Sequence, residues 1–143
     1  MSTATEMLRT HPQKPTAYFD MIAECIEACF DCELASITCA DACMGEQDFA
    51  MLRQCARLNL DCADLCAATG RMVARQADPD AALWRATLEA CIQACKSSGD
   101  ECAKHAKTHE HCRRCADACR RCEKACRDLL QALPGGDPSE ARH

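Results

Sequence analysis

One stretch decides the fold of this chain: Cys112-Arg113-Arg114-Cys115-Ala116-Asp117-Ala118-Cys119-Arg120-Arg121-Cys122-Glu123-Lys124-Ala125-Cys126. Its five cysteines are separated by 3, 4, 3 and 4 residues, which places them on one face of an α-helix. The charged side chains between them suit the opposite face, which meets solvent. The stretch therefore predicts an amphipathic helix whose buried face carries thiols at the positions where leucines usually lie.

The same spacing recurs in three earlier segments of the chain. We expect helices from about Thr16 to Gly45, from Asp48 to Gln76, from Pro79 to about Lys107, and from Thr108 to Leu133. Thr16 is the expected cap of the first helix and Gly45 its end, and Asp78-Pro79 is the expected start of the third. Gly99 lies inside the third helix and should weaken it by about 1 kcal/mol relative to alanine.

Four long helices with short connections predict an all-α fold, an antiparallel four-helix bundle with cysteines lining the core. The bundle should span residues 16–133 as one domain. Residues 1–15 form an N-terminal arm, in which Thr3 to Arg9 suit either a short helix or a frayed segment. Residues 134–143 are expected to be a disordered tail.

Composition narrows the class of protein. Sixteen cysteines in 143 residues would ordinarily indicate a secreted disulfide scaffold. However, Met1 to Lys14 contain no apolar run, glycine and proline number only five each, and helical spacing suits disulfides poorly. We therefore expect free thiols and a cytoplasmic location. The net charge of −5 and the lack of a long apolar segment give no support to nucleic-acid binding or membrane insertion.

Cysteines at this density on four helical faces indicate metal binding, because one or two buried thiols can be inert but sixteen aligned ones have no packing purpose. The candidate metal ligands are Cys25, Cys29, Cys32, Cys39, Cys43, Cys55, Cys62, Cys66, Cys91, Cys95, Cys102, Cys112, Cys115, Cys119, Cys122 and Cys126. Ser36, Asn59, Thr69 and Ser98 interrupt these faces and should form hydrogen bonds across the core. The amide oxygen of Asn59 is a further candidate ligand.

Antiparallel packing assigns different side chains to the two ends of the bundle. One end collects soft donors, namely Met44, Met51, His105, His109 and His111. The other collects apolar side chains, namely Tyr18, Phe19, Ile22, Met72, Val73, Leu83, Trp84, Leu88, Leu129 and Leu133. We expect metal to pass through the first end, with His105 the foremost ligand because it continues the cysteine face. Met44 and Met51 also suit a plain packing role.

The donor set favours Cu(I). Thiolate binds Cu(I), zinc and iron–sulfur clusters. Zinc sites need four convergent ligands, whereas these cysteines lie in continuous rows, and the Cys-x2-Cys-x2-Cys runs typical of iron–sulfur clusters are absent. Cu(I) accepts two or three thiolates, which pairs such as Cys25 and Cys29 can supply.

Charge favours a high copper number. A copper ion held by two unshared thiolates carries a net negative charge, and burying about eight such charges is prohibitive. Sharing each thiolate between two ions neutralises the core, so we expect bridged clusters of multiple Cu(I) ions per chain, near one ion per sulfur. The thiols of the metal-free protein should be mostly protonated, so that loading releases protons.

The repeated Cys-x3-Cys pairs and the end rich in histidine and methionine resemble the bacterial copper storage proteins, and more closely their cytosolic branch. The resemblance covers about residues 16–133. It implies a homotetramer of four-helix bundles, each filled with Cu(I) from one end, with no catalytic residues. The function we expect is therefore cytosolic copper storage or buffering without enzymatic activity, with copper donor or acceptor proteins as partners.

Two other functions remain open at this point. The chain could be a zinc or general soft-metal sink, which stoichiometric zinc retained in the presence of Cu(I) would support. It could also be a thiol redox sensor, for which specific and reversible disulfides would be needed.

Overall fold

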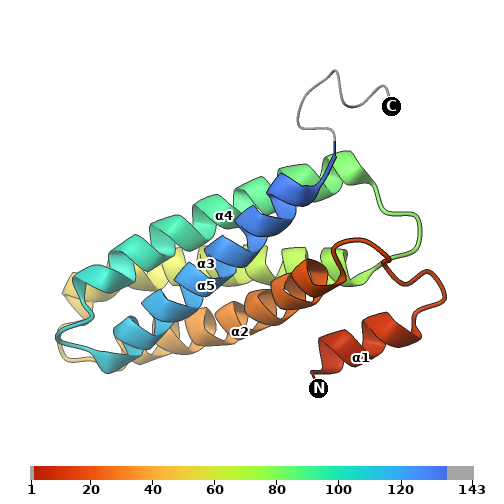
Figure 1. The fold of residues 1–143 in the computed structure, drawn as a ribbon. Coiled ribbons are helices and arrows are strands. Elements are labelled where there is room, and N and C mark those ends of the chain that lie inside the picture. The colour runs from red at the N-terminus through yellow and green to blue at the C-terminus, as the bar shows by residue number, and fades with distance from the viewer. Residues whose placement is uncertain (1, 135–143) are drawn as a thin grey trace.

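Five helices make up this computed structural model, which describes residues 2–134 (Figure 1). Helix α1 covers Thr3–Thr10, α2 covers Phe19–Met44, α3 covers Phe49–Ala74, α4 covers Ala81–Lys104 and α5 covers Glu110–Ala132. No strand occurs among the described residues. The all-α fold class that the cysteine spacing predicts is confirmed.

The four long helices form a ring around one core. Each packs against the next along the chain, and α5 closes the ring against α2. The α2–α3 and α4–α5 connections lie at one end of the ring, and the α3–α4 connection lies at the other (Figure 1). This arrangement is the predicted antiparallel four-helix bundle. We call the two ends the histidine end, which holds His105, His109 and His111, and the apolar end, which holds Trp84 and Leu129.

The bundle begins later than expected, and Thr16 is not a helix cap. Tyr18 is the N-cap of α2, with a left-handed backbone (φ 62°) and no side-chain hydrogen bond to the helix. The short helix α1 packs alongside α2, so the chain has to reverse direction between them. The non-helical residues 11–18 make that reversal, which holds Thr16 out of the helix.

The start of α4 also differs from the expected one. Asp78 is not the cap, since it adopts a left-handed backbone with φ 50° in the loop from α3. Asp80 caps the helix instead, because its carboxylate accepts a hydrogen bond of 3.0 Å from the backbone N–H of Leu83. The far end of α4 is shorter than expected as well, because the helix ends at Lys104 with His105 as its C-cap.

The ends of the chain add little to the core. Leu8 of α1 is buried against the bundle, so the expected N-terminal arm includes a docked helix. The expected disordered tail lies almost wholly outside the described residues, which end at Pro134. Among the helices described, none combines the length and the apolar character needed to cross a bilayer.

Candidate metal centre

All sixteen cysteines are free thiols buried in the bundle. The most exposed of them, Cys39, has only 2% of its surface in contact with solvent. The reason is local, since a repeat of three and four residues keeps every thiol of a helix on the side that faces the ring axis. The core is therefore lined with sulfur, as the sequence predicts.

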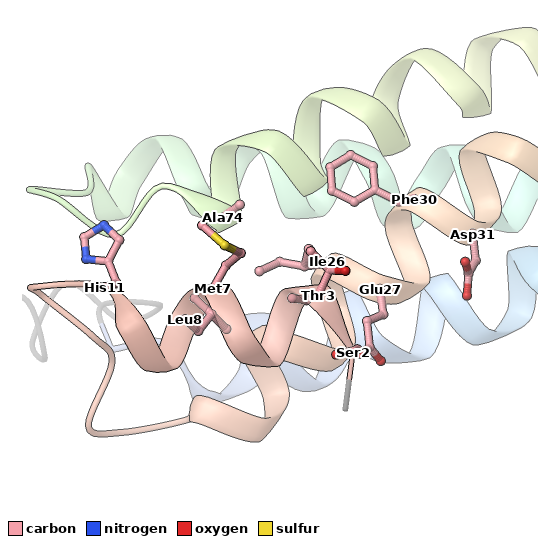
Figure 2. A pocket seen from close by; sticks show the side chains of 11 residues that line it. Ser2, Thr3, Met7, Leu8, His11, Ile26, Glu27, Phe30, Asp31 and Ala74 are labelled. Atoms are coloured by element: carbon pink, nitrogen blue, oxygen red, sulfur yellow. The ribbon is translucent and has the colours of Figure 1, made fainter.

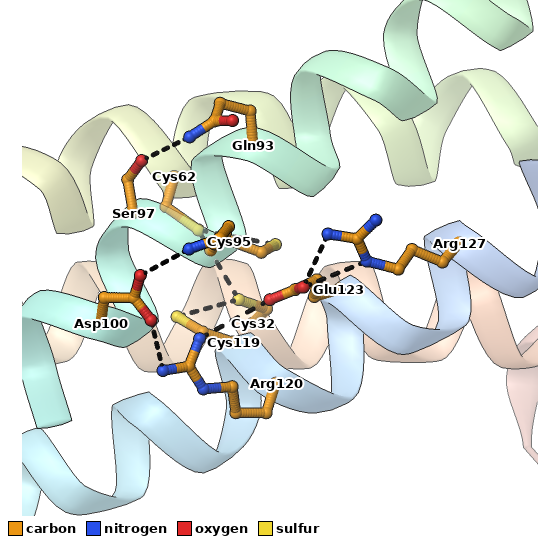
Figure 3. Close-up of polar contacts among 11 residues, drawn as sticks. Cys32, Cys62, Gln93, Cys95, Ser97, Asp100, Cys119, Arg120, Glu123 and Arg127 are labelled. Carbon is orange, nitrogen blue, oxygen red and sulfur yellow. Dashed lines mark hydrogen bonds and ion pairs between the residues drawn. The ribbon is translucent and has the colours of Figure 1, made fainter.

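Sulfur atoms from different helices meet in the half of the core nearer the apolar end. The Sγ atom of Cys32 on α2 lies 3.8 Å from that of Cys62 on α3 and 3.8 Å from that of Cys119 on α5 (Figure 3). Two groups of four thiols have all their sulfurs within 4.8 Å of one another. These groups are Cys29, Cys91, Cys122 and Cys126, and Cys32, Cys66, Cys95 and Cys122. Cys122 belongs to both, so the groups can share a bridging thiolate.

A second gathering of donors lies near the histidine end. The sulfurs of Cys55 and Cys102 are 3.4 Å apart, and those of Cys39 and Cys112 are 3.9 Å apart. The ring of His111 joins the second pair, with its Nδ1 atom 3.3 Å from the Cys39 sulfur and 3.6 Å from the Cys112 sulfur. Cys43 completes a group in which one imidazole and three thiols lie within 4.8 Å of one another.

His111 is oriented as a metal ligand requires. Its Nδ1 atom faces the thiols, while Nε2 lies 3.3 Å from a carboxylate oxygen of Glu46. Histidines that bind metals ordinarily use one ring nitrogen for the metal and the other for a carboxylate or carbonyl, which holds the ring in place. The arrangement can therefore bind a soft metal through nitrogen as well as sulfur.

His109 contacts carboxylates on both ring nitrogens. Nε2 lies 3.0 Å from Asp48 and Nδ1 lies 3.4 Å from Glu46. Its hydrogen bond with Asp48 raises the pKa of His109, and the same hydrogen bond lowers the pKa of Asp48. The ring stacks on that of His111, with centroids 5.4 Å apart. His109 thus lies beside His111 and contacts the same carboxylate, that of Glu46.

His105 has a different position from the one that its place in the cysteine face suggests. As the C-cap of α4 its Nε2 atom lies 3.5 Å from Glu101 and makes no hydrogen bond. No hydrogen bond in the described part of the chain joins it to a thiol. The hydrogen bonds therefore join His111 to the sulfur core, and the assignment of His105 as a ligand stays a prediction.

Met44 and Met51 lie at the histidine end with their side chains largely in solvent. Met44 is 55% exposed and Met51 is 73% exposed. The neighbouring Leu52 is fully buried instead and occupies the inward position on the first turn of α3. Their assignment as ligands stays a prediction, and one that requires each side chain to turn inward.

The polar residues of the cysteine faces form a hydrogen-bonded layer. The Asn59 Oδ1 atom accepts hydrogen bonds from Ser98 at 2.8 Å, from Cys102 at 3.2 Å and from Cys115 at 3.4 Å. Ser36 Oγ lies 3.8 Å from the sulfurs of Cys32 and Cys115. The expected hydrogen bonds across the core are thus present. Thr69 differs, since its hydroxyl donates to the backbone of Leu65 on its own helix.

Burial and mutual hydrogen bonding give the thiols widely different pKa values. Desolvation raises the pKa of Cys43 to about 12. Hydrogen bonds from Cys126 and Cys29 lower the pKa of Cys25 to about 6, and hydrogen bonding with Cys119 lowers that of Cys62 to about 6. Thiolate in this core is thus stable only where neighbouring thiols donate to it, and a bound cation would replace those protons.

Comparison with known proteins agrees with this donor set. A family model for copper storage proteins matches residues 19–131. The chain belongs to the copper storage protein family. The matched range begins at the first residue of α2 and ends one residue before the end of α5, so it covers the whole sulfur-lined bundle of this copper storage protein.

The structure of this copper storage protein is similar to that of Ccsp, the copper storage protein of Streptomyces lividans, loaded with 10 copper equivalents. The two are 47% identical with a TM-score of 0.89, covering 92% of this chain and 100% of the other. A form of the cytosolic Ccsp with five coppers is 50% identical with a TM-score of 0.78, covering 80% of this chain and 95% of the other. An uncharacterized cysteine-rich protein of Bacillus subtilis strain 168, YhjQ, is 36% identical over 94 residues, covering 66% of this chain and 82% of that one.

Three carboxylates of the site are missing from the sequence-based set of residues. Glu101 contacts His105, Asp48 contacts His109, and Glu46 contacts both His109 and His111. Glu46 and Asp48 lie in or beside the short α2–α3 turn, which reads in sequence only as a polar connection. The contacts of Glu46 and Asp48 with histidines follow from the α2–α3 and α4–α5 turns lying side by side, which the helix periodicity does not encode.

Proposed function

We propose that this protein stores Cu(I) in its core, bound by the cysteine thiolates, and that it acts without enzymatic catalysis. The observation that carries this proposal is the contact of thiols from all four helices, with four-sulfur groups within 4.8 Å. Cu(I) is a soft cation that thiolate binds well. The relative Ccsp was loaded with 10 copper equivalents, which supports a capacity of many ions.

Bridged clusters fit this core better than isolated sites. Cys122 belongs to both four-sulfur groups, so a thiolate there can bind ions in each. Sharing thiolates also keeps the number of positive ions close to the number of negative sulfurs, which limits the cost of buried charge. We expect a copper number near one ion per cysteine.

Copper enters at the histidine end in this proposal. His111 presents Nδ1 to Cys39 and Cys112, and the carboxylates of Glu46 and Asp48 lie beside the histidines, where they can attract a cation. The opposite end is filled by fully buried Leu88 and Leu129 together with Val73. A cation has no donor atoms to follow through those side chains.

Anaerobic titration with Cu(I) in competition with a chelator of known affinity tests the storage function. We expect many ions per chain, bound more tightly than by a small free thiol. Saturation at only a few ions would contradict the proposal. The four-sulfur groups also suit tetrahedral zinc, so the same titration in the presence of zinc decides between the metals. Zinc that resists displacement by Cu(I) would favour a zinc sink.

We also propose that the protein is cytoplasmic and homo-oligomeric, as a tetramer. Its relative Ccsp is a cytosolic protein, and free thiols persist in a reducing compartment. One face of α2 exposes apolar side chains at helical spacing: Phe30 is 39%, Leu34 68% and Ile37 47% exposed. Beside them lies a groove of about 690 Å³ between α1 and the bundle, lined by residues such as Met7 and Ile26 (Figure 2).

An apolar face of this kind is typical of a contact between copies of a chain. Sedimentation of the wild type and of a Leu34→Glu variant tests the oligomer. We expect a tetramer that the variant breaks down, and a monomeric wild type would contradict this part of the proposal alone.

A further inference from the structure

The sulfur core is interrupted at one level. Ser36 of α2, Asn59 of α3 and Ser98 of α4 replace cysteine there, and each is completely buried. The Ser98 hydroxyl donates to the Asn59 amide oxygen at 2.8 Å, and that oxygen also accepts from two thiols. Three of the four walls of the core thus present oxygen and nitrogen at this level. We call these three residues the polar layer.

The polar layer separates the thiols into two compartments. The histidine-end compartment contains Cys39, Cys43, Cys55, Cys102, Cys112 and Cys115. The apolar-end compartment contains Cys25, Cys29, Cys32, Cys62, Cys66, Cys91, Cys95, Cys119, Cys122 and Cys126. Within residues 2–134, the thiol pairs with sulfurs hydrogen-bonded at 3.4–4.0 Å belong to one compartment each, whereas the interaction of Cys119 with Cys115, which raises the pKa of Cys115, crosses the layer.

Helix α5 differs from the other three helices, because no polar residue takes the place of a cysteine on its buried face at this level. On α2, α3 and α4 the cysteines on either side of the layer are seven residues apart, which corresponds to about 10 Å along a helix. On α5 the corresponding cysteines, Cys115 and Cys119, are four residues apart, or about 6 Å along the axis. Only this pair is close enough in sequence for side chains of adjacent turns to meet across the layer.

Both members of the pair contact the compartment on their own side. Cys115 donates to Asn59 at 3.4 Å and belongs to a three-sulfur group with Cys39 and Cys102. Cys119 belongs to a group with Cys32 and Cys62, and lies 3.8 Å from the Cys32 sulfur (Figure 3). Cys115 and Cys119 therefore lie next to each other on α5 while each contacts a different compartment.

We propose that copper passes between the compartments along α5, from Cys115 to Cys119, and that the polar layer makes this step the slow one in filling the core. The proposal rests on Cu(I) storage as the function. Hydroxyl and amide oxygens are poor ligands for a soft cation, so an ion that leaves Cys115 finds its next strong donor at Cys119. The histidine-end compartment then fills and empties first, and the apolar-end compartment holds the slowly exchanging copper.

The transfer is an exchange of ligands without a change of oxidation state. A bond from Cu(I) to the Cys119 sulfur forms as the bond to Cys115 breaks. The proton displaced from the Cys119 thiol passes to the Cys115 thiolate unless a second copper ion arrives there. Successive ions from the histidine end repeat the step until the apolar-end thiolates are occupied.

Anaerobic stopped-flow uptake of Cu(I), followed by the ultraviolet absorption of copper–thiolate bonds, tests this proposal. The wild type should fill in two phases, with amplitudes near six and ten thiols. Cys119→Ser should slow the second phase by about tenfold or more. The matched control is Asp117→Ser, at an exposed position of α5 between the two cysteines, which keeps every thiol in place and should leave the rate of the second phase near that of the wild type.

A second variant separates loss of the step from damage to the core. Ser36 Oγ lies 3.8 Å from both the Cys32 and Cys115 sulfurs, so Ser36→Cys supplies a thiol across the layer on α2. Added to Cys119→Ser, it should restore the fast second phase. A single phase in the wild type, equal second-phase rates in Cys119→Ser and Asp117→Ser, or no rescue by Ser36→Cys would each overturn the proposal. Failure of the wild type to bind many ions would instead overturn the storage function itself.

Discussion

The three histidines of the histidine end have the same side chain but different contacts. His111 contacts the Cys39 and Cys112 sulfurs as well as Glu46, whereas the contacts of His105 and His109 are with the carboxylates of Glu101, Glu46 and Asp48. An imidazole against thiols is a ligand candidate, and an imidazole against carboxylates is a side chain that a cation passes. Substitution of His111 should therefore affect copper binding differently from substitution of His105 and His109.

Replacing His105 and His109 together by alanine should slow copper uptake by about tenfold. The number of copper ions bound at the end of loading should change much less. The reason is that the hydrogen bonds of the described residues join neither ring to a thiol. Uptake kinetics and final stoichiometry measured on one sample decide this. His111→Ala is the control, since it removes a donor from the Cys39, Cys43 and Cys112 group and should lower capacity or affinity at that group. Lost capacity at an unchanged rate in the double variant would contradict the assignment.

At the scale of elements, the packing of α4 on α5 explains Gly99. Its helix propensity alone suggests a weak point, yet the residue is buried where the two helices approach closely. A Cβ atom added there would lie 3.2 Å from the Cys119 Cβ atom and 3.0 Å from the Arg120 guanidinium. Arg120 in turn pairs with Asp100 of α4 across the same contact (Figure 3). The glycine thus lets α5 hold Cys119 next to the polar layer.

Gly99→Ala should therefore lower the free energy of unfolding by about 1 kcal/mol. Alanine stabilises a helix by about 1 kcal/mol relative to glycine. Overpacking a close helix contact costs about 1–3 kcal/mol, which outweighs that gain. Denaturant unfolding of the metal-free protein under reducing conditions measures the change. Glu89→Ala, at an exposed position of the same helix, is the control and should alter stability by less. A clearly stabilised Gly99→Ala would show that α4 and α5 can move apart without cost.

At the scale of the whole molecule, copper loading is coupled to protons. Cys43 has its pKa raised to about 12 by desolvation, and burial likewise raises the pKa of Cys112. Such thiols are protonated at neutral pH and lose their protons when they bind metal. Cys25 and Cys62, with pKa values lowered to about 6, are mostly ionised above that pH and release few protons.

Copper affinity should therefore rise with pH through the neutral range, by up to about tenfold per pH unit for each proton that an ion displaces. The sign follows from the raised pKa values, since higher pH removes the competing protons before copper arrives. Chelator competition at pH 6 to 9, together with the protons counted by pH-stat during loading, measures the coupling. Affinity that does not change with pH would mean that the core is already ionised in the metal-free protein.

Much of the fold could be predicted because it follows from short-range periodicity. The 3-4 spacing of Cys112 to Cys126 and of the three earlier faces sets the helices and their buried sides. The helix ends were harder to predict. Thr16 and Asp78 have suitable side chains for caps, but the reversals after α1 and α3 place Tyr18 and Asp80 at those positions instead.

The sequence by itself determined the bundle, the sulfur lining and the collection of histidines at one end, because each depends on spacing along a helix and on antiparallel order. Only the tertiary structure decided that His111 is hydrogen-bonded to thiols while His105 lies beside Glu101, and that Met44 and Met51 lie largely in solvent. These outcomes depend on how the α2–α3 and α4–α5 turns approach each other and on the rotation of side chains at helix ends. Neither is constrained by a repeat of three and four residues, which acts only where the helix continues.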